Sequence, residues 1–143
     1  MTILIDKKTK VLIQGITGNE GSRAAKEMLS YGTHVMAGVT PSKGGQRLEG
    51  VPVYDTVREA KKNHPEINAS LIAVPAFAVK DAAIEAITAG IPLINILTEL
   101  VTPKDCSEIF ALSRDMGVRV VGPASVGIIS PEKGKVGSIG SSG

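Results

Sequence analysis

The sequence predicts a single α/β domain built on a doubly wound parallel sheet, and three observations support this prediction. Short apolar runs alternate with helical patterns along the 143 residues, which is typical of repeated strand–helix units. The length suits one domain with a sizeable core. Hydrophobic residues make up 43% of the chain and aromatic residues only 3%, so the core has to consist of aliphatic side chains, which suit parallel sheets.

Five apolar runs are expected to form the strands of this sheet. They span Lys10–Gln14, His34–Gly38, Ala69–Val74, Leu93–Leu97 and Arg119–Val121. Helices are expected in the gaps, because parallel neighbours need a crossover connection. The first helix begins near residue 20, and the others span Thr56–Asn63, Val79–Ala89 and Pro103–Met116.

Local signals mark the ends of these helices. Thr56 and Glu59 have the spacing of a capping box. Gly90 follows the apolar stripe of the third helix and stops it just before a proline. The fourth helix has Pro103 in its first turn and Gly117 at its end, a combination typical of helix boundaries.

Loops that lead from a strand into the next helix all lie at the carboxyl edge of a parallel sheet. Residues that are scattered in sequence therefore come together at this edge, which is where ligands bind in such folds. The loops expected there are Gly15–Gly21, Thr40–Gly45, Pro75–Phe77, Thr98–Thr102 and Pro123–Gly127.

The first of these loops predicts an anion site. Gly15, Gly18 and Gly21 punctuate the passage from the first strand into the first helix, and glycine lets the backbone turn sharply and approach a ligand closely. The first N–H groups of a helix have no partner within the helix, so a phosphate is a suitable guest. The spacing is not G-x-G-x-x-G, and an ordinary turn would also use glycine.

The loop after the second strand narrows the choice of ligand. A dinucleotide-binding fold places a carboxylate there for the ribose hydroxyls, whereas this chain has Pro41 and Lys43 among small residues. A flexible cation suits a second cluster of phosphates better than a ribose. We therefore expect an adenine cofactor rich in phosphate, with an NADP-like site or ordinary loop chemistry as the alternatives.

Composition narrows the classes of partner. The 16 basic and 14 acidic residues are spread along the chain, without the basic run that nucleic-acid binding requires. No apolar run approaches the length of a membrane span, and Cys106 is the one cysteine. We expect a protein of the cytoplasm or an organelle matrix that binds neither nucleic acid nor membrane and holds no metal. His34 and His64 are expected to be structural or to face solvent.

The end of the chain differs in composition from the rest. An irregular stretch begins at Gly122, and the last residues are mostly glycine and serine, which is typical of a linker. We expect a domain over residues 1–130 and a linker over 131–143. The linker would lead to a second domain, although a natural flexible terminus accounts for the same composition.

Several motifs, in this order along nearly the whole chain, closely resemble the CoA-binding domain of the α subunit of succinyl-CoA synthetase (succinate–CoA ligase). The resemblance rests on the segments Ile3–Lys7, Gln14–Gly21, Gly38–Gly45, Thr56–Ala60, Val74–Ala76, Leu97–Glu99 and Gly122–Pro123.

The resemblance implies a Rossmann-like domain that binds coenzyme A, with the 3′-phospho-ADP part on the first loop and the pantetheine across the carboxyl edge. It implies that three groups of residues contact coenzyme A, in addition to Gly15 and Gly21 at the two ends of the first loop. These are Thr17, Gly18, Asn19 and Glu20 in the first loop, Pro41 and Lys43 in the second, and Val74, Pro75, Leu97, Thr98 and Glu99 beyond them.

The resemblance also implies a role in a larger enzyme. The phosphoryl group would pass through a histidine in the second α domain, with an ATP-grasp β subunit as partner and succinate or a related di- or tricarboxylate as substrate. The present chain alone would be inactive. Its location would be the cytoplasm, or the mitochondrial matrix in a eukaryote.

Three departures from the family pattern bear on function. Glu20 stands where the family often has an amide, and Leu100 replaces a turn glycine. The segment from Gly122 to Gly127 looks more like ATP-citrate lyase and citryl-CoA synthetase, which favours a citrate-using member as one alternative. A stand-alone CoA-binding module without catalysis is the other.

Overall fold

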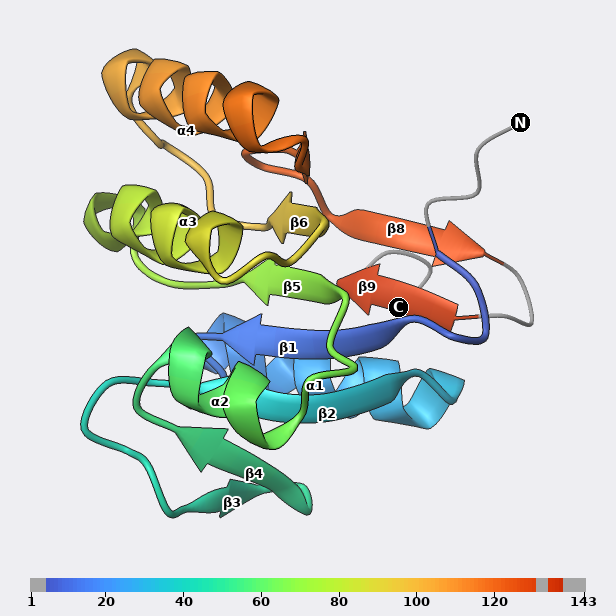
Figure 1. Ribbon diagram of the computed structural model, residues 1–143. Helices are drawn as coiled ribbons and strands as arrows, with labels where there is room; N and C mark the ends of the chain where they lie inside the picture. Colours follow the sequence, from blue (N-terminus) through green and yellow to red (C-terminus); the bar gives the residue numbers. More distant parts are fainter. Residues whose placement is uncertain (1–4, 131–133, 138–143) are drawn as a thin grey trace.

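The computed structural model describes residues 5–130 and 134–137, and its centre is a seven-stranded sheet. The strand order is β3-β4-β2-β1-β5-β6-β7, and all pairings are parallel except that of β3 with β4 (Figure 1). The strands are β1 Lys10–Gln14, β2 His34–Val39, β3 Arg47–Leu48, β4 Val51–Tyr54, β5 Ala69–Ile72, β6 Leu93–Ile96 and β7 Arg119–Val121.

The chain builds outwards from β1 in two directions. It first moves through β2 to β3 and β4, and then crosses back over β1 to β5, β6 and β7. The direction therefore reverses between β1 and β5, and this is the point at which doubly wound sheets bind ligands outside the carboxyl ends of their strands. The predicted fold class is confirmed.

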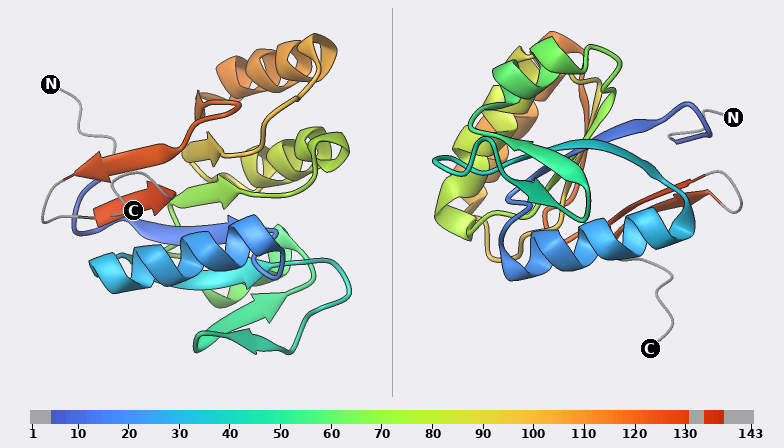
Figure 2. Two further views of the ribbon diagram at one scale, coloured as in Figure 1. Left: turned by 180° about the vertical axis from the view of Figure 1, so that it is seen from behind. Right: turned by 90° about the horizontal axis from the view of Figure 1, so that it is seen from below.

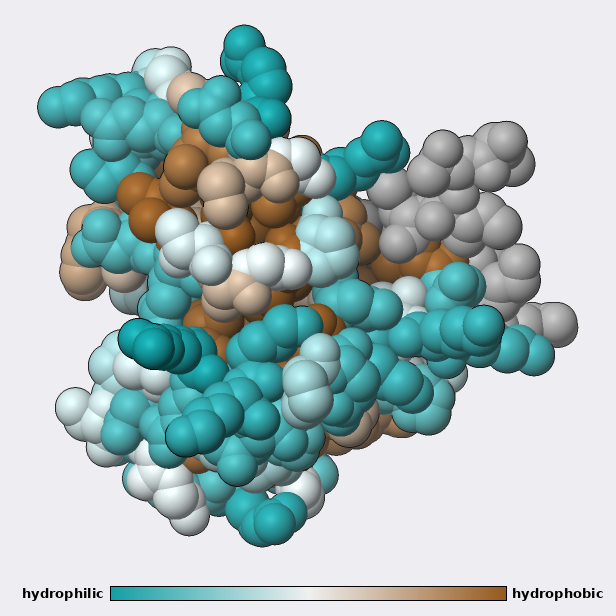
Figure 3. Space-filling view, viewed as in Figure 1, coloured by the Kyte–Doolittle hydropathy of each residue, from teal (hydrophilic) through white to brown (hydrophobic). Residues whose placement is uncertain are grey.

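Helices cover the two faces of the sheet unequally. α2 Val57–Asn63, α3 Val79–Thr88 and α4 Pro103–Met116 pack on one face, and a 3₁₀ turn at Ala76–Ala78 precedes α3. The other face carries α1 Asn19–Tyr31 and, beside it, the hairpin of β8 Gly127–Ser130 and β9 Gly134–Gly137 (Figure 2). The outer surface of the three-helix face is mainly hydrophilic around α2 and shows hydrophobic residues around α3 and α4 (Figure 3).

Alternation along the strands divides the core between the two faces. In β1, Leu12 belongs to the cluster under α2, α3 and α4, whereas Val11 and Ile13 belong to the cluster under α1. All three side chains are fully buried, which explains why the strand reads as a continuous apolar run. None of the described helices has the length and apolarity needed to cross a membrane.

The predicted strands and helices are all present, with ends that differ by no more than two residues. Strands β3 and β4 and the β8–β9 hairpin were not predicted. Residues 134–137, expected in the linker, instead form β9, while residues 138–143 lie outside the described part of the chain.

Contacts with α1 and with Thr33, just beyond its end, hold β9 in place. Val136 is buried against the core under α1, the Thr33 hydroxyl donates to the carbonyl of Lys135 at 2.9 Å, and the Gly137 N–H donates to the Met28 sulfur at 3.4 Å. These partners are about a hundred residues away in sequence, so composition near the end of the chain gave no sign of them.

Candidate functional site

The three glycines of the first loop have different structural roles. Gly15 has φ +86°, and a Cβ there would collide with the backbone of Ala73. A Cβ on Gly21 would overlap the carbonyl of Gly15. These two glycines are therefore required by the close packing of the loop. Gly18 has φ −76°, and a Cβ there would meet nothing closer than the Gly15 oxygen at 3.4 Å, so the fold itself does not demand glycine at this position.

Gly18 is the N-cap of α1, and no side chain caps this helix. In α2 the Thr56 hydroxyl accepts a hydrogen bond from the Glu59 N–H at 3.1 Å, and in α4 the Thr102 hydroxyl accepts one from the Asp105 N–H at 3.2 Å. The start of α1 thus lacks the side-chain acceptor that those two helices have, and its first N–H groups can meet a ligand.

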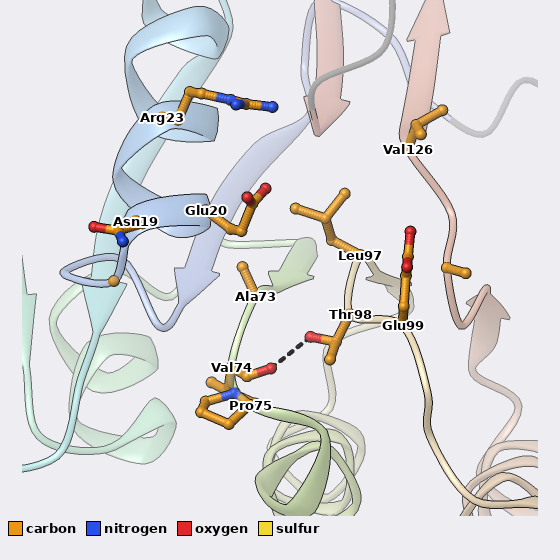
Figure 4. Close-up of a pocket in the computed structure, with 12 residues that line it drawn as sticks. Asn19, Glu20, Arg23, Ala73, Val74, Pro75, Leu97, Thr98, Glu99 and Val126 are labelled. Carbon is orange, nitrogen blue, oxygen red and sulfur yellow. Dashed lines mark hydrogen bonds between the residues drawn. The ribbon is translucent and has the colours of Figure 1, made fainter.

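A cleft of about 620 Å³, which we call the α1 cleft, opens beside this helix start. It lies between α1 and the segment that leads into β8, over the carboxyl ends of β5 and β6 (Figure 4). Its position is next to the topological switch point, where ligands are expected. The lining residues are Gly18, Asn19, Glu20, Arg23, Ala73, Val74, Pro75, Leu97, Thr98, Glu99, Ala124 and Val126.

A second cavity of about 450 Å³, the β2 pocket, lies on the other side of the same wall. It shares Gly18, Ala73, Val74 and Pro75 with the α1 cleft and extends to the end of β2. Together the two cavities extend along the carboxyl edge from the end of β2 to the segment before β8. The other residues that line the β2 pocket are Gln14, Gly15, Thr17, Val39, Thr40, Pro41, Ala78, Asp81, Ala82 and Glu85.

Hydrogen bonds between neighbouring loops fix the walls of both cavities. The Thr98 hydroxyl donates to the carbonyl of Val74 at 2.6 Å, which joins the loops after β5 and β6 (Figure 4). The hydroxyls of Thr17 and Thr40 lie 3.0 Å apart and join the loops after β1 and β2. The Ala124 N–H donates to the carbonyl of Thr98 at 3.0 Å. The site is therefore largely preformed.

Three charged side chains line the α1 cleft. Glu20 and Arg23 extend into it from α1, and Glu99 lies on the opposite wall (Figure 4). Arg23 has a long ion pair with Glu27, with 4.0 Å between Nε and Oε1, and 65% of its side chain is exposed. The cleft can therefore offer a guanidinium and backbone N–H groups to an anion, and two carboxylates to a hydrogen-bond donor.

The structure brings together nearly all the residues singled out from the sequence. Every predicted site residue lines one or both cavities except Gly21 and Lys43. Gly21 packs against the carbonyl of Gly15 inside the turn, and Lys43 lies in the exposed loop after β2. The sequence prediction missed Arg23 and the residues of α3 that line the β2 pocket. It placed the loop of Ala124 and Val126 at this edge but assigned it no contact residue.

The histidines and the cysteine lie elsewhere. His34 is exposed at the start of β2. His64 Nε2 lies 3.0 Å from the Tyr54 hydroxyl, and Cys106 is half-buried. None of them lines either cavity, and the described residues contain no group of histidine, cysteine and carboxylate side chains arranged to hold a metal ion.

Comparison with known proteins identifies relatives across almost the whole chain. Over 139 residues it is 48% identical to the succinate–CoA ligase [ADP-forming] subunit alpha of Aquifex aeolicus, and over 138 residues it is 44% identical to the ADP-forming sulfoacetate-CoA ligase subunit SqwL of an Acholeplasma species. These alignments cover 96% of this chain but 45% and 46% of the relatives. The chain thus spans about half the length of the curated proteins it matches.

Solved structures share the fold. An ATP citrate lyase from Methanothrix soehngenii, in complex with citrate and coenzyme A, matches 94% of this chain and 24% of its own, with a TM-score of 0.81 and 21% identity. A conserved hypothetical protein from Pyrococcus furiosus matches 79% of this chain and 91% of its own, with a TM-score of 0.62 and 25% identity.

The family comparison is the most direct evidence for the cofactor. Residues 6–100, which include β1 to β6 and most of both cavities, match the CoA binding domain family. The prediction of coenzyme A is confirmed by this match. The chain belongs to the CoA binding domain family.

Proposed function

We propose that this chain is the CoA-binding part of the α subunit of an ADP-forming acid–CoA ligase of the succinate–CoA ligase type. The identity of 44–48% to subunits of such ligases supports this assignment. The observation that carries the binding geometry is the uncapped start of α1, which opens into two adjoining cavities at the switch point of the sheet.

The residues present fit coenzyme A. The bare backbone at Gly18 suits the diphosphate, because a helix start offers N–H groups and a partial positive charge. The β2 pocket, with Pro41 and Ala78 in its lining, suits the adenosine end. Val74, Pro75 and Leu97 offer an apolar path for the pantetheine. When bound, coenzyme A supplies the thiol that becomes the thioester.

The contribution of this chain is binding and orientation. Loops joined by the hydrogen bonds of Thr98 and Thr17 hold the ligand at the sheet edge, and Glu99 faces the cleft as a hydrogen-bond acceptor. Phosphoryl transfer needs a nucleotide cradle and a group that receives the phosphoryl. We assign these to a histidine in a second α domain and to an ATP-grasp β subunit, in the cytoplasm or the mitochondrial matrix.

The acid substrate in this proposal is succinate or a related di- or tricarboxylate. The named acids of the relatives, succinate and sulfoacetate, each carry a second acidic group. The segment from Gly122 to Gly127 looks more like ATP-citrate lyase and citryl-CoA synthetase, and its residues Ala124 and Val126 line the cleft. A ligase that uses citrate is therefore the main variant of the proposal.

A stand-alone CoA-binding module is the second candidate function. The Pyrococcus furiosus chain favours it, because this chain covers 91% of that protein, so the fold occurs in a chain of similar size. Such a module would hold or sense coenzyme A without forming a thioester.

Titration calorimetry and a turnover assay test these proposals separately. Coenzyme A and dephospho-CoA are expected to bind the 143-residue chain, whereas NADP is not. Binding of NADP without either form of coenzyme A would refute the ligand. Thioester formation with ATP, Mg²⁺ and succinate or citrate is expected only when a second α domain and a β subunit are added. Turnover by this chain alone would refute the proposed division of labour, and no turnover in the reconstituted enzyme would favour the stand-alone module.

A further inference from the structure

Arg23 is a cation in the α1 cleft without a strong partner. Among the residues that line this cleft in the described part of the chain, it is the one with a positive charge. Its ion pair with Glu27 is at the 4.0 Å limit of such contacts. Figure 4 shows the side chain leaving α1 on the side of the cleft instead of lying along the helix. The guanidinium therefore has donors to offer to a ligand.

Glu20 places a negative charge beside the proposed phosphate position, and a nearby cation would offset it. Its carboxylate lies in the first turn of α1 and lines the same cleft as the uncapped helix start. A carboxylate stabilises a helix start, but it repels a phosphate that binds at the same place. Arg23 lies three residues further along, on the same side of the helix, and Figure 4 shows both side chains on the cleft side.

Lys43, the cation expected from the sequence to meet a phosphate, does not line either cavity. It lies in the exposed loop beyond the end of β2, next to the adenosine side of the site as proposed above. The diphosphate over α1 and the 3′-phosphate at the β2 end would then meet different cations.

We propose that Arg23 holds the diphosphate of coenzyme A over the start of α1 and offsets the charge of Glu20. This inference rests on the proposed function and adds to it a binding residue that the sequence did not reveal. Arginine suits the role because its planar fork donates two parallel hydrogen bonds to phosphate oxygens.

The test measures binding of coenzyme A and dephospho-CoA to the wild-type chain and to Arg23→Gln. Since dephospho-CoA keeps the diphosphate and lacks the 3′-phosphate, the variant is expected to bind both ligands about tenfold more weakly, the scale of one lost charged hydrogen bond. Lys26→Gln is the matched control: it removes the same charge from α1, and Lys26 is paired with Glu49 outside the cleft. It should leave both affinities unchanged.

Glu20→Gln provides an independent measurement. Removing the carboxylate is expected to strengthen binding of both ligands in the wild-type background and to restore part of the affinity that Arg23→Gln loses. Circular dichroism and thermal melting of each variant show that the fold is retained.

Specific outcomes would overturn the assignment while leaving the proposed function intact. Unchanged affinity in a folded Arg23→Gln protein would show that the guanidinium does not meet the ligand. A loss confined to coenzyme A would place Arg23 at the 3′-phosphate. A loss confined to succinyl-CoA, with coenzyme A unaffected, would place it at the acyl group. Failure of the wild-type chain to bind coenzyme A would instead refute the proposed function itself.

Discussion

The starts of α1 and α4 follow parallel strands at the same edge of the sheet, yet they are built differently. α4 begins with the Thr102 cap, with Pro103 in its first turn and with Asp105 donating its N–H to the cap. α1 begins at Gly18 with no side-chain cap. A Ser or Thr cap stabilises a helix by about 1 kcal/mol relative to alanine but only by a few tenths relative to glycine, so the fold loses little by leaving the start of α1 without a side-chain acceptor.

The two helix starts differ in whether the chain itself supplies a hydrogen-bond acceptor for the first N–H groups. Where the sequence satisfies its own N–H groups, as in α4, the helix start is a structural element. Where it leaves them bare beside a cavity, as in α1, the proposed function assigns the helix start to the ligand. Substitutions at the start of α1 should therefore weaken binding and change stability little. Substitutions at the start of α4 should lower stability and leave binding unchanged.

The largest effect is expected from Gly18→Val. A β-branched side chain at the cap of α1 would keep a phosphate away from two or more N–H groups, so coenzyme A should bind roughly 100-fold more weakly. The fold should change in stability by less than about 1 kcal/mol, because a Cβ on Gly18 meets no atom closer than 3.4 Å. Calorimetry and thermal melting measure the two effects, and normal binding by the variant would show that this loop is not the site.

Thr102→Ala is the complementary change at α4. Removing the hydroxyl that accepts from the Asp105 N–H should lower the free energy of unfolding by about 1 kcal/mol. Affinity for coenzyme A should not change, because Thr102 lines neither cavity. Denaturant unfolding of Thr102→Ala beside Thr102→Ser tests this, since serine keeps the cap. A loss of affinity without a loss of stability would reverse the proposed roles.

Lys43→Ala is expected to act on the ligand at the other end of the site. Binding of coenzyme A should weaken by about 1 kcal/mol, the lower part of the range for a hydrogen bond to a charged group, because Lys43 is exposed. Dephospho-CoA should be affected less, since it lacks the 3′-phosphate. Equal affinities of wild type and variant for coenzyme A would show that Lys43 is an ordinary loop lysine.

The smallest effect concerns the contact between α3 and the start of α4. The Lys80 ammonium lies 3.2 Å from Glu108 and 3.9 Å from Asp105. The hydrogen bond with Glu108, and then the charges of Glu108 and Asp105, raise the pKa of Lys80 above its ordinary value. The stability from this contact is therefore fully present below the ordinary lysine pKa and disappears as the pH rises through the raised pKa.

Melting temperatures of wild type and Lys80→Gln between neutral and strongly alkaline pH check this expectation. The small advantage of the wild type should vanish at the alkaline end. Affinity for coenzyme A at neutral pH should be the same in both proteins, because Lys80 does not line either cavity. A difference in melting temperature that persists unchanged to high pH would show that the lysine acts through packing alone.

The sequence determined the parts of this protein that local chemistry controls. The five predicted strands carry short apolar runs that have to be buried, and the caps and stops at Thr56, Gly90 and Gly117 act within a few residues. The loop from Gly15 to Gly21 was also recognisable in the sequence, because tight turns need glycine at particular positions. Since parallel strands present their carboxyl ends at one edge, these local features were enough to bring most of the site together.

The remaining features depend on tertiary contacts, because these contacts join residues far apart in the chain. β9 is a strand because Thr33 and Met28 of a distant segment bind its backbone. Arg23 belongs to the cleft because the segment leading into β8 folds back to form the opposite wall. Nothing within a few residues of Lys43 or Arg23 shows which cation faces the cavity. That depends on how the loops and the hairpin pack around the sheet edge, and packing is a property of the whole fold.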